Sequence, residues 1–152
     1  MKHVPDNYTN VTPYLCCKNA AAAMEFYKSV FDAIELMRIA QPDGTIGHAE
    51  LKIGESVIML ADEFPDLDVR SPQSLGGSAV SILVYVENVD AVVAKALAAG
   101  SKLQRAVADQ FYGDRSGKLV DPFGHVWMIA THIEDVPPDE MRRRAAALYG
   151  DK

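Results

Sequence analysis

The fold is decided by two stretches, VTPYLCCKNAAAAMEFYKSVF at residues 11–31 and AVSILVYVENVDAVVAKALAA at residues 79–99. Each begins with alternating apolar residues, which are typical of a strand. Each continues with an asparagine, Asn19 or Asn88, that can cap a following helix. A shift of 69 residues carries the first asparagine onto the second. The chain is therefore predicted to be an internal repeat.

The residues after each helix extend the repeat. In the first half they predict strands over Glu35–Ala40, Ile46–Ile53 and Ser56–Ala61, and in the second over Lys102–Ala108, Lys118–Val120 and His125–Ala130. Turns are predicted at Pro42-Asp43-Gly44 and at Asp121-Pro122-Phe123-Gly124. The same 69-residue shift superimposes Gly44 on Gly113, Val57 on Val126 and Met59 on Met128. The prediction is an α+β fold of two βαβββ modules.

Domain organisation follows from this order. We expect a single domain over residues 1–152, with modules at 10–62 and 79–133. Residues 63–78 have little hydrophobic periodicity and read as a linker. Residues 134–152 read as a C-terminal helix, with acidic residues first and the basic residues 142–144 further along, an arrangement that complements the helix dipole.

Composition restricts the function classes. The chain has 49% hydrophobic and 24% charged residues, which is normal for a globular protein. Its net charge of −6 argues against nucleic acid as the partner. No apolar run is long enough to cross a membrane, and residues 1–10 do not resemble a secretory signal. The adjacent Cys16 and Cys17 are poorly placed to form a disulfide with each other. We expect a cytoplasmic protein.

The pattern resembles the vicinal-oxygen-chelate superfamily, which includes glyoxalases, fosfomycin-resistance enzymes, extradiol dioxygenases and bleomycin-resistance proteins. The resemblance covers about residues 10–133, and its most specific mark is Asp121-Pro122-Phe123-Gly124-His125. Residues 13–15, 47–51 and 123–128 look most like the branch labelled PhnB-like. The resemblance implies that the modules form a cupped mixed sheet whose concave side holds a ligand, and that the protein is a homodimer.

Metal-dependent members of this superfamily place four ligands on strands that line the cup. The resemblance carries these positions onto Thr12, Met59, Ser81 and Met128. Hydroxyl and thioether groups are poor ligands for a hard divalent ion, which prefers imidazole or carboxylate. We therefore expect no metal and no other cofactor, and the glyoxalase, fosfomycin-transferase and dioxygenase mechanisms are not supported.

His48 and Glu50 are the candidate catalytic residues. They alternate with apolar residues on the third predicted strand and so share one face of it. This pair can be the polar face of an ordinary strand, an acid/base pair that contacts a ligand, or two ligands of a rearranged metal site completed by Asp109 or Asp114.

The loop after the sixth predicted strand supplies further candidates. Gln110, Tyr112 and Arg115 can bind the polar end of a small molecule, or they can simply form a bent strand and its turn. His125 and His132 are expected to be exposed or locally bonded, and Trp127 to lie in the core. The full set of predicted ligand-binding residues is Tyr14, His48, Glu50, Met59, Ser81, Gln110, Tyr112, Arg115 and Met128.

Three functions remain open at this point. The first is a metal-free protein that binds a small organic molecule in its cup, as bleomycin-resistance proteins do. The second is an enzyme, lyase-like or isomerase-like with His48 or Glu50 as base, or dioxygenase-like with a rearranged metal site. The third is a non-catalytic scaffold whose cup is filled by side chains.

Overall fold

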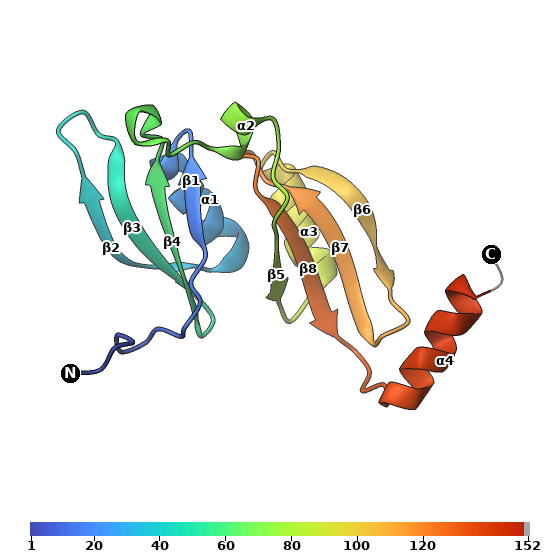
Figure 1. Cartoon of the computed structure of the whole chain (residues 1–152). Coiled ribbons are helices and arrows are strands. Elements are labelled where there is room, and N and C mark those ends of the chain that lie inside the picture. The colour runs from blue at the N-terminus through green and yellow to red at the C-terminus, as the bar shows by residue number, and fades with distance from the viewer. Residues whose placement is uncertain (151–152) are drawn as a thin grey trace. The chain divides into compact units, whose positions relative to one another are not determined.

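A computed structural model describes residues 1–150 and contains two compact units (Figure 1). Unit 1 comprises Met1–Val80 together with Asp121–His125, and unit 2 comprises Ser81–Val120 and the chain from Val126 onward. Each unit contains one four-stranded mixed sheet with a helix against one face. The predicted α+β architecture with two βαβββ modules is confirmed.

Unit 1 has the strand order β1-β4-β3-β2, with β1 parallel to β4 and the other pairs antiparallel. Its helix is apolar on the side that faces the sheet, where it buries Met24, Tyr27 and Val30. The elements are β1 (Tyr14–Cys17), α1 (Ala20–Phe31), β2 (Ile34–Ala40), β3 (Ile46–Ile53) and β4 (Ser56–Asp62).

Unit 2 repeats this topology with the order β5-β8-β7-β6. Trp127 lies in its core at 1% exposure, as predicted. The strand predicted to start at Lys118 is longer, because the backbone pairs with β8 as far back as Asp114. The elements are β5 (Ser81–Tyr85), α3 (Val89–Ala98), β6 (Lys102–Asp109), β7 (Asp114–Val120), β8 (Val126–His132) and α4 (Pro138–Tyr149).

The helix starts confirm the repeat in atomic detail. Both predicted caps form, with Asn19 Oδ1 accepting from the amide of Ala22 and Asn88 Oδ1 accepting from that of Ala91, each at 3.1 Å. A second contact at each helix start obeys the same shift. The amide of Ala20 donates to Asp62 Oδ1, and that of Val89 donates to Thr131 Oγ1, each at 3.0 Å. The last strand of each module thus anchors its own helix.

The Asp-Pro-Phe-Gly turn between β7 and β8 is part of unit 1. Asp121 is buried and accepts a hydrogen bond from the hydroxyl of Tyr27 on α1. The ring of Phe123 packs edge-on against Phe26, with ring centres 6.1 Å apart. Gly124 has a φ of +89° and closes the turn against Pro72, whose Cβ would lie only 3.0 Å from an added Cβ.

The predicted linker over residues 63–78 has structure of its own. It contains a 3₁₀ turn, η1 (Pro65–Leu67), a one-turn helix, α2 (Pro72–Leu75), and a bridge between Phe64 and Val69. Sequence periodicity missed these elements because each is shorter than the window that a period requires. No helix within residues 1–150 has the length and apolar character that a membrane crossing needs.

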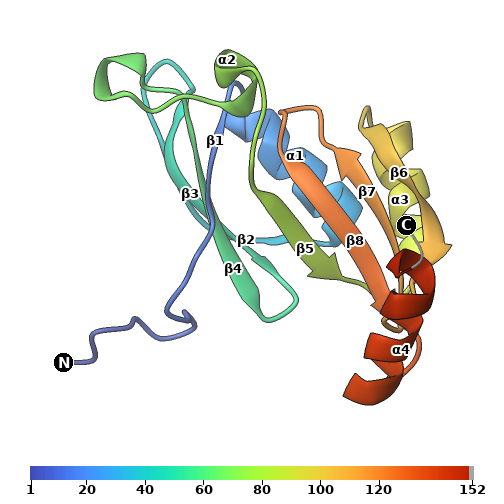
Figure 2. The ribbon, with the colours of Figure 1, turned by 45° about the vertical axis from the view of Figure 1, so that its right-hand side comes forward.

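Helix α4 follows β8 through an extended segment and lies at the end of unit 2 (Figure 2). Arg144 fixes it by pairing with Glu134 at 2.7 Å and donating to the carbonyl of Phe111 at 3.1 Å. The amides of Ile133 and Glu134 both donate to the carbonyl of Gly113, which holds the segment against the β6–β7 turn. The end of the predicted helical segment, residues 151–152, lies outside the described residues.

Candidate functional site

The open face of the sheet in unit 1 brings four predicted ligand-binding residues together. Tyr14 on β1 is paired with Met59 on β4, which is paired in turn with Glu50 on β3. His48 lies two residues before Glu50 and therefore faces the same side. The alternate residues of these strands, among them Leu60, are buried beneath α1. These four residues share a face because successive side chains of a strand point to opposite sides, and this alternation can be read from the sequence.

Three of these side chains form a polar chain across the face. Tyr14 Oη lies 2.7 Å from His48 Nδ1, and His48 Nε2 lies 3.5 Å from Glu50 Oε2. The side chains of His48 and Glu50 are only 25% and 12% exposed. Burial raises the pKa of the Tyr14 phenol, with a smaller contribution from Cys16, so Tyr14 is a neutral hydroxyl at physiological pH.

A pocket of about 480 Å³ lies beside this chain in unit 1. Strand residues form one side of it, and the structured loop after β4 forms the other. No Asp, Glu, Lys or Arg side chain occurs among the described residues that line it. The lining residues are Tyr14, Gln41, Gly47, Ala61, Phe64, Leu67 and Val69. The three loop residues were not among the predicted site residues, because residues 63–78 were predicted to be a linker.

Glu63 stabilises the loop after β4 that lines the pocket. Its Oε1 accepts from the amide of Ser71 at 2.8 Å and from the hydroxyls of Ser71 and Ser74, each at 2.5 Å. These donors lower the pKa of the carboxyl to about 2, the serine hydroxyls contributing most. Hydrogen bonds to an ionised group are stronger than neutral ones. The strength of these three hydrogen bonds therefore depends on the charge of Glu63.

We expect the contribution of the Glu63 hydrogen bonds to the stability of the folded protein to vary with pH. The folded-state pKa of Glu63 lies below the unfolded value of about 4.3, so the stabilisation is full above that value and is lost as the pH falls towards 2. Glu63→Gln keeps the shape and removes the charge. The melting-temperature gap between wild type and Glu63→Gln should therefore shrink between pH 6 and pH 3. A constant gap, or an equal effect from the exposed Glu87→Gln, would contradict this assignment.

Neither cysteine has the lowered pKa that is typical of a reactive thiol. Burial, followed by the charges of Glu63 and Asp62, raises the pKa of the Cys16 thiol to about 11. Cys17 is fully buried, and its pKa is raised further. The thiolate is the reactive form, so neither residue is activated at neutral pH. The Cys16 carbonyl lies 2.8 Å from His125 Nε2. The prediction that His125 is exposed or locally bonded is therefore wrong, because the residue is buried and contacts a strand residue 109 positions earlier in the chain.

Unit 2 carries a second polar cluster, which the sequence did not predict. Asp114, which is buried, accepts from Tyr85 Oη and contacts His132 Nδ1, both at 2.8 Å, while His132 Nε2 contacts Asp135 at 2.7 Å. Hydrogen bonds to Asp135 and then Asp114 raise the pKa of His132. Asp114 and His132 are direct partners across β7 and β8. Starting that strand at Lys118 left Asp114 in a loop and concealed the pairing.

Met128 and Ser81, the counterparts of Met59 and Thr12, are also in unit 2. Met128 pairs with Lys118 on one side and with Leu83 on the other, and Ser81 is exposed at the start of β5. Met59 and Met128 occupy equivalent positions in their sheets, because their partners on the first strand of each module also differ by the 69-residue shift.

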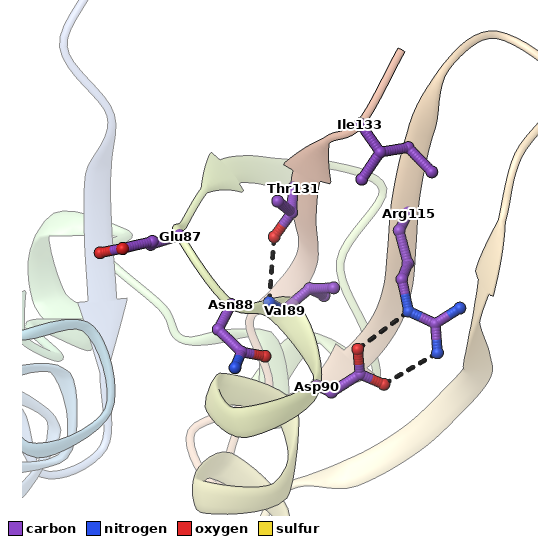
Figure 3. Close-up of a pocket in the computed structure, with 7 residues that line it drawn as sticks. All are labelled: Glu87, Asn88, Val89, Asp90, Arg115, Thr131 and Ile133. Carbon is purple, nitrogen blue, oxygen red and sulfur yellow. Dashed lines mark hydrogen bonds and ion pairs between the residues drawn. The ribbon is translucent and has the colours of Figure 1, made fainter.

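Arg115 points to the opposite face of β7 from Asp114. It forms a two-pronged ion pair with Asp90 at the start of α3, at 2.8 and 2.9 Å, and a third contact with Asp109 at 3.0 Å. It lines a pocket of about 360 Å³ beside Asn88 and Thr131 (Figure 3). The structure therefore separates Arg115 from the face that carries Met128.

Gln110 and Tyr112 lie in the β6–β7 turn. Gln110 Nε2 donates to the carbonyl of Ala108 at 3.3 Å, and the ring of Tyr112 packs edge-on against Phe111 at 5.2 Å. The predicted trio of Gln110, Tyr112 and Arg115 is therefore divided between this turn and the helix side of β7, and a role for these residues in ligand binding stays a prediction.

The chemistry of the donors decides whether the expected metal position suits an ion. Thr12 and Met59 lie in unit 1, and Ser81 and Met128 in unit 2. Two thioethers and two hydroxyls supply neither charge nor imidazole nitrogen, so this set does not fit a hard divalent ion. Within residues 1–150, no group of three or more His, Cys, Asp or Glu side chains is arranged to hold a metal.

Comparison with known proteins agrees with the module arrangement. The family model described as the Glyoxalase/Bleomycin resistance protein/Dioxygenase superfamily matches residues 7–129. The chain belongs to this superfamily. A superfamily relative in Mycobacterium bovis, an uncharacterized protein, is 41% identical over 144 residues, which cover 93% of this chain and 94% of the relative.

Solved structures resemble most of the chain. The X-ray structure of an Arabidopsis thaliana gene product has a TM-score of 0.65 and 30% identity, and covers 81% of this chain and 98% of its own. The PhnB protein from Bacillus cereus has a TM-score of 0.65 at 22% identity, with 81% of this chain and 99% of that chain covered. At that identity the likeness to PhnB shows the fold alone.

Proposed function

We propose that this superfamily member binds a small, largely apolar organic molecule in the pocket of unit 1, without a metal ion. The observation that carries the proposal is the pocket itself, about 480 Å³ in volume, with Phe64, Leu67 and Val69 on one wall and Tyr14 at its edge. Binding sites for small molecules usually have 300–1,000 Å³, apolar walls and a few polar groups. The charge-free lining favours an uncharged ligand or ligand segment.

Family membership supports a binding role, because the superfamily takes part of its name from bleomycin-resistance proteins. An open pocket in unit 1 argues against a scaffold whose cavity is filled by its own side chains. We further propose that the protein is cytoplasmic and acts as a homodimer, as the resemblance implies. Because the net charge is negative, we do not propose nucleic acid as a partner.

A thermal-shift screen of small metabolites and antibiotics tests the proposal, because a ligand that binds only the folded state raises the melting temperature. Val69→Phe fills the pocket, and Val80→Phe makes the same change at an exposed position outside it. Hits should stabilise wild type and Val80→Phe but not Val69→Phe. The proposal fails if hits stabilise Val69→Phe equally, or if no compound stabilises the wild type.

A second candidate is a lyase or isomerase in which His48 or Glu50 moves a proton. The contacts of Tyr14, His48 and Glu50 favour it, since a histidine between a carboxylate and a hydroxyl is a common acid/base arrangement. Turnover of a compound found in the screen, lost in His48→Gln with binding retained, would place this candidate above simple binding.

A further inference from the structure

The contact between His48 and Glu50 favours one direction for the hydrogen bond between Tyr14 and His48. A carboxylate only accepts, so Glu50, 3.5 Å from His48 Nε2, favours a proton on that nitrogen. Neutral imidazole then has only a lone pair on Nδ1. With the proton on Nε2, Tyr14 donates across the 2.7 Å contact to His48 Nδ1. The hydroxyl of Tyr14 is committed to the protein, and only its oxygen lone pairs remain available.

The rest of the pocket gives the ligand few other polar partners. Gly47, Ala61, Phe64, Leu67 and Val69 contribute no polar side-chain atom to the lining. Gln41 is the other residue of the lining with a polar side chain, and its Oε1 already accepts from the Thr45 hydroxyl at 3.1 Å. Among the side chains of the lining, the acceptor that remains for a ligand is therefore the oxygen of Tyr14.

Resting on the proposed function, we infer that the pocket selects neutral ligands that offer an O–H or N–H donor to Tyr14 Oη. An anion would meet the lone pairs of Tyr14 and no cationic side chain in the lining. A neutral molecule without a donor would offer no hydrogen bond to that oxygen. The chemical class is an apolar ring or chain that carries a hydroxyl or an amide N–H. His48 and Glu50 act here as positioning residues.

Three matched probes test this inference: 2-naphthol, 2-methoxynaphthalene and 2-naphthoate. They share one ring system and offer, respectively, a neutral donor, a neutral acceptor only and an anion. Titration into ¹⁵N-labelled full-length protein, followed at the amides of Phe64, Leu67 and Val69, gives each dissociation constant. We expect naphthol to bind about two- to tenfold more tightly than the methoxy compound, as one neutral hydrogen bond allows, and naphthoate to bind weakest.

Variants separate the acceptor from the shape of the pocket. Tyr14→Phe should abolish the naphthol preference and leave methoxynaphthalene binding within about twofold. His48→Leu should also reduce the difference in affinity between naphthol and methoxynaphthalene. Here the cause should be tighter binding of methoxynaphthalene, because the freed Tyr14 hydroxyl can then donate to the ether. His132→Leu, the same change in unit 2, should leave the preference intact. A merely structural role for His48 would weaken all three probes together.

The possible failures are distinct. Equal binding of naphthol and methoxynaphthalene, or tightest binding of naphthoate, overturns the inference and leaves the binding pocket standing. If no probe perturbs the three loop amides, both the inference and the proposed pocket are wrong.

Discussion

Replacing Asp121 with alanine is expected to lower the free energy of unfolding by about 3 to 5 kcal/mol, because a buried charged acceptor disappears and its donors remain. Asp121 is 4% exposed. It accepts from the hydroxyl of Tyr27 at 2.5 Å and from the amides of Phe123 and His125 at 2.8 and 3.0 Å. The loss should appear in unit 1, to which this turn belongs.

Urea denaturation followed by circular dichroism measures this loss. Tyr27→Phe removes one of these donors and should cost only about 1 to 2 kcal/mol. Asp43→Ala removes the acidic residue of the exposed turn in the other module, where Asp43 accepts from the amide of Thr45 at 3.0 Å, and should cost less than about 1 kcal/mol. Equal losses in Asp121→Ala and Asp43→Ala would show that burial of the turn is not what stabilises unit 1.

The sequence was sufficient to predict the modules because their signals are local. Asn19 and Asn88 cap their helices within three residues, and strand alternation places Tyr14, His48 and Glu50 on one face. The 69-residue shift also holds for contacts that the sequence analysis did not use, such as the anchoring of each helix start by the last strand of its module. Agreement between local signals and long-range pairing explains why the repeat could be recognised.

The remainder of the site depends on contacts between residues far apart in the chain. The pocket wall at Phe64 and Val69 is made by a bridge inside a segment without periodicity. Arg115 was expected beside the other polar residues, but strand alternation from Asp114 turns it towards Asp90, which is 25 residues away. The pocket wall was not predicted because its elements are very short. The direction of Arg115 was not predicted because it depends on where β7 begins.

Gly113→Ala is expected to cost about 2 to 4 kcal/mol, far more than the same change at the equivalent Gly44. Both glycines have positive φ, +98° and +88°, so each alanine incurs about 1 kcal/mol of left-handed strain. The space around them differs. A Cβ on Gly113 would lie 2.1 Å from the carbonyl oxygen of Glu134, a backbone atom, whereas a Cβ on Gly44 would have no heavy atom within 4 Å. The additional loss of stability in Gly113→Ala arises because the new methyl group forces residues 133–136 outward.

That displacement has a local signature besides the change in stability. The amides of Ile133 and Glu134 donate to the Gly113 carbonyl, at 2.9 and 3.0 Å, and should lose protection from hydrogen exchange in Gly113→Ala. Helix α4 should loosen with them, because Arg144 holds it through Glu134 and the carbonyl of Phe111. In Gly44→Ala these amides should exchange as in wild type. If Gly113→Ala leaves their exchange unchanged, the close approach of this turn to the C-terminal segment does not fix α4.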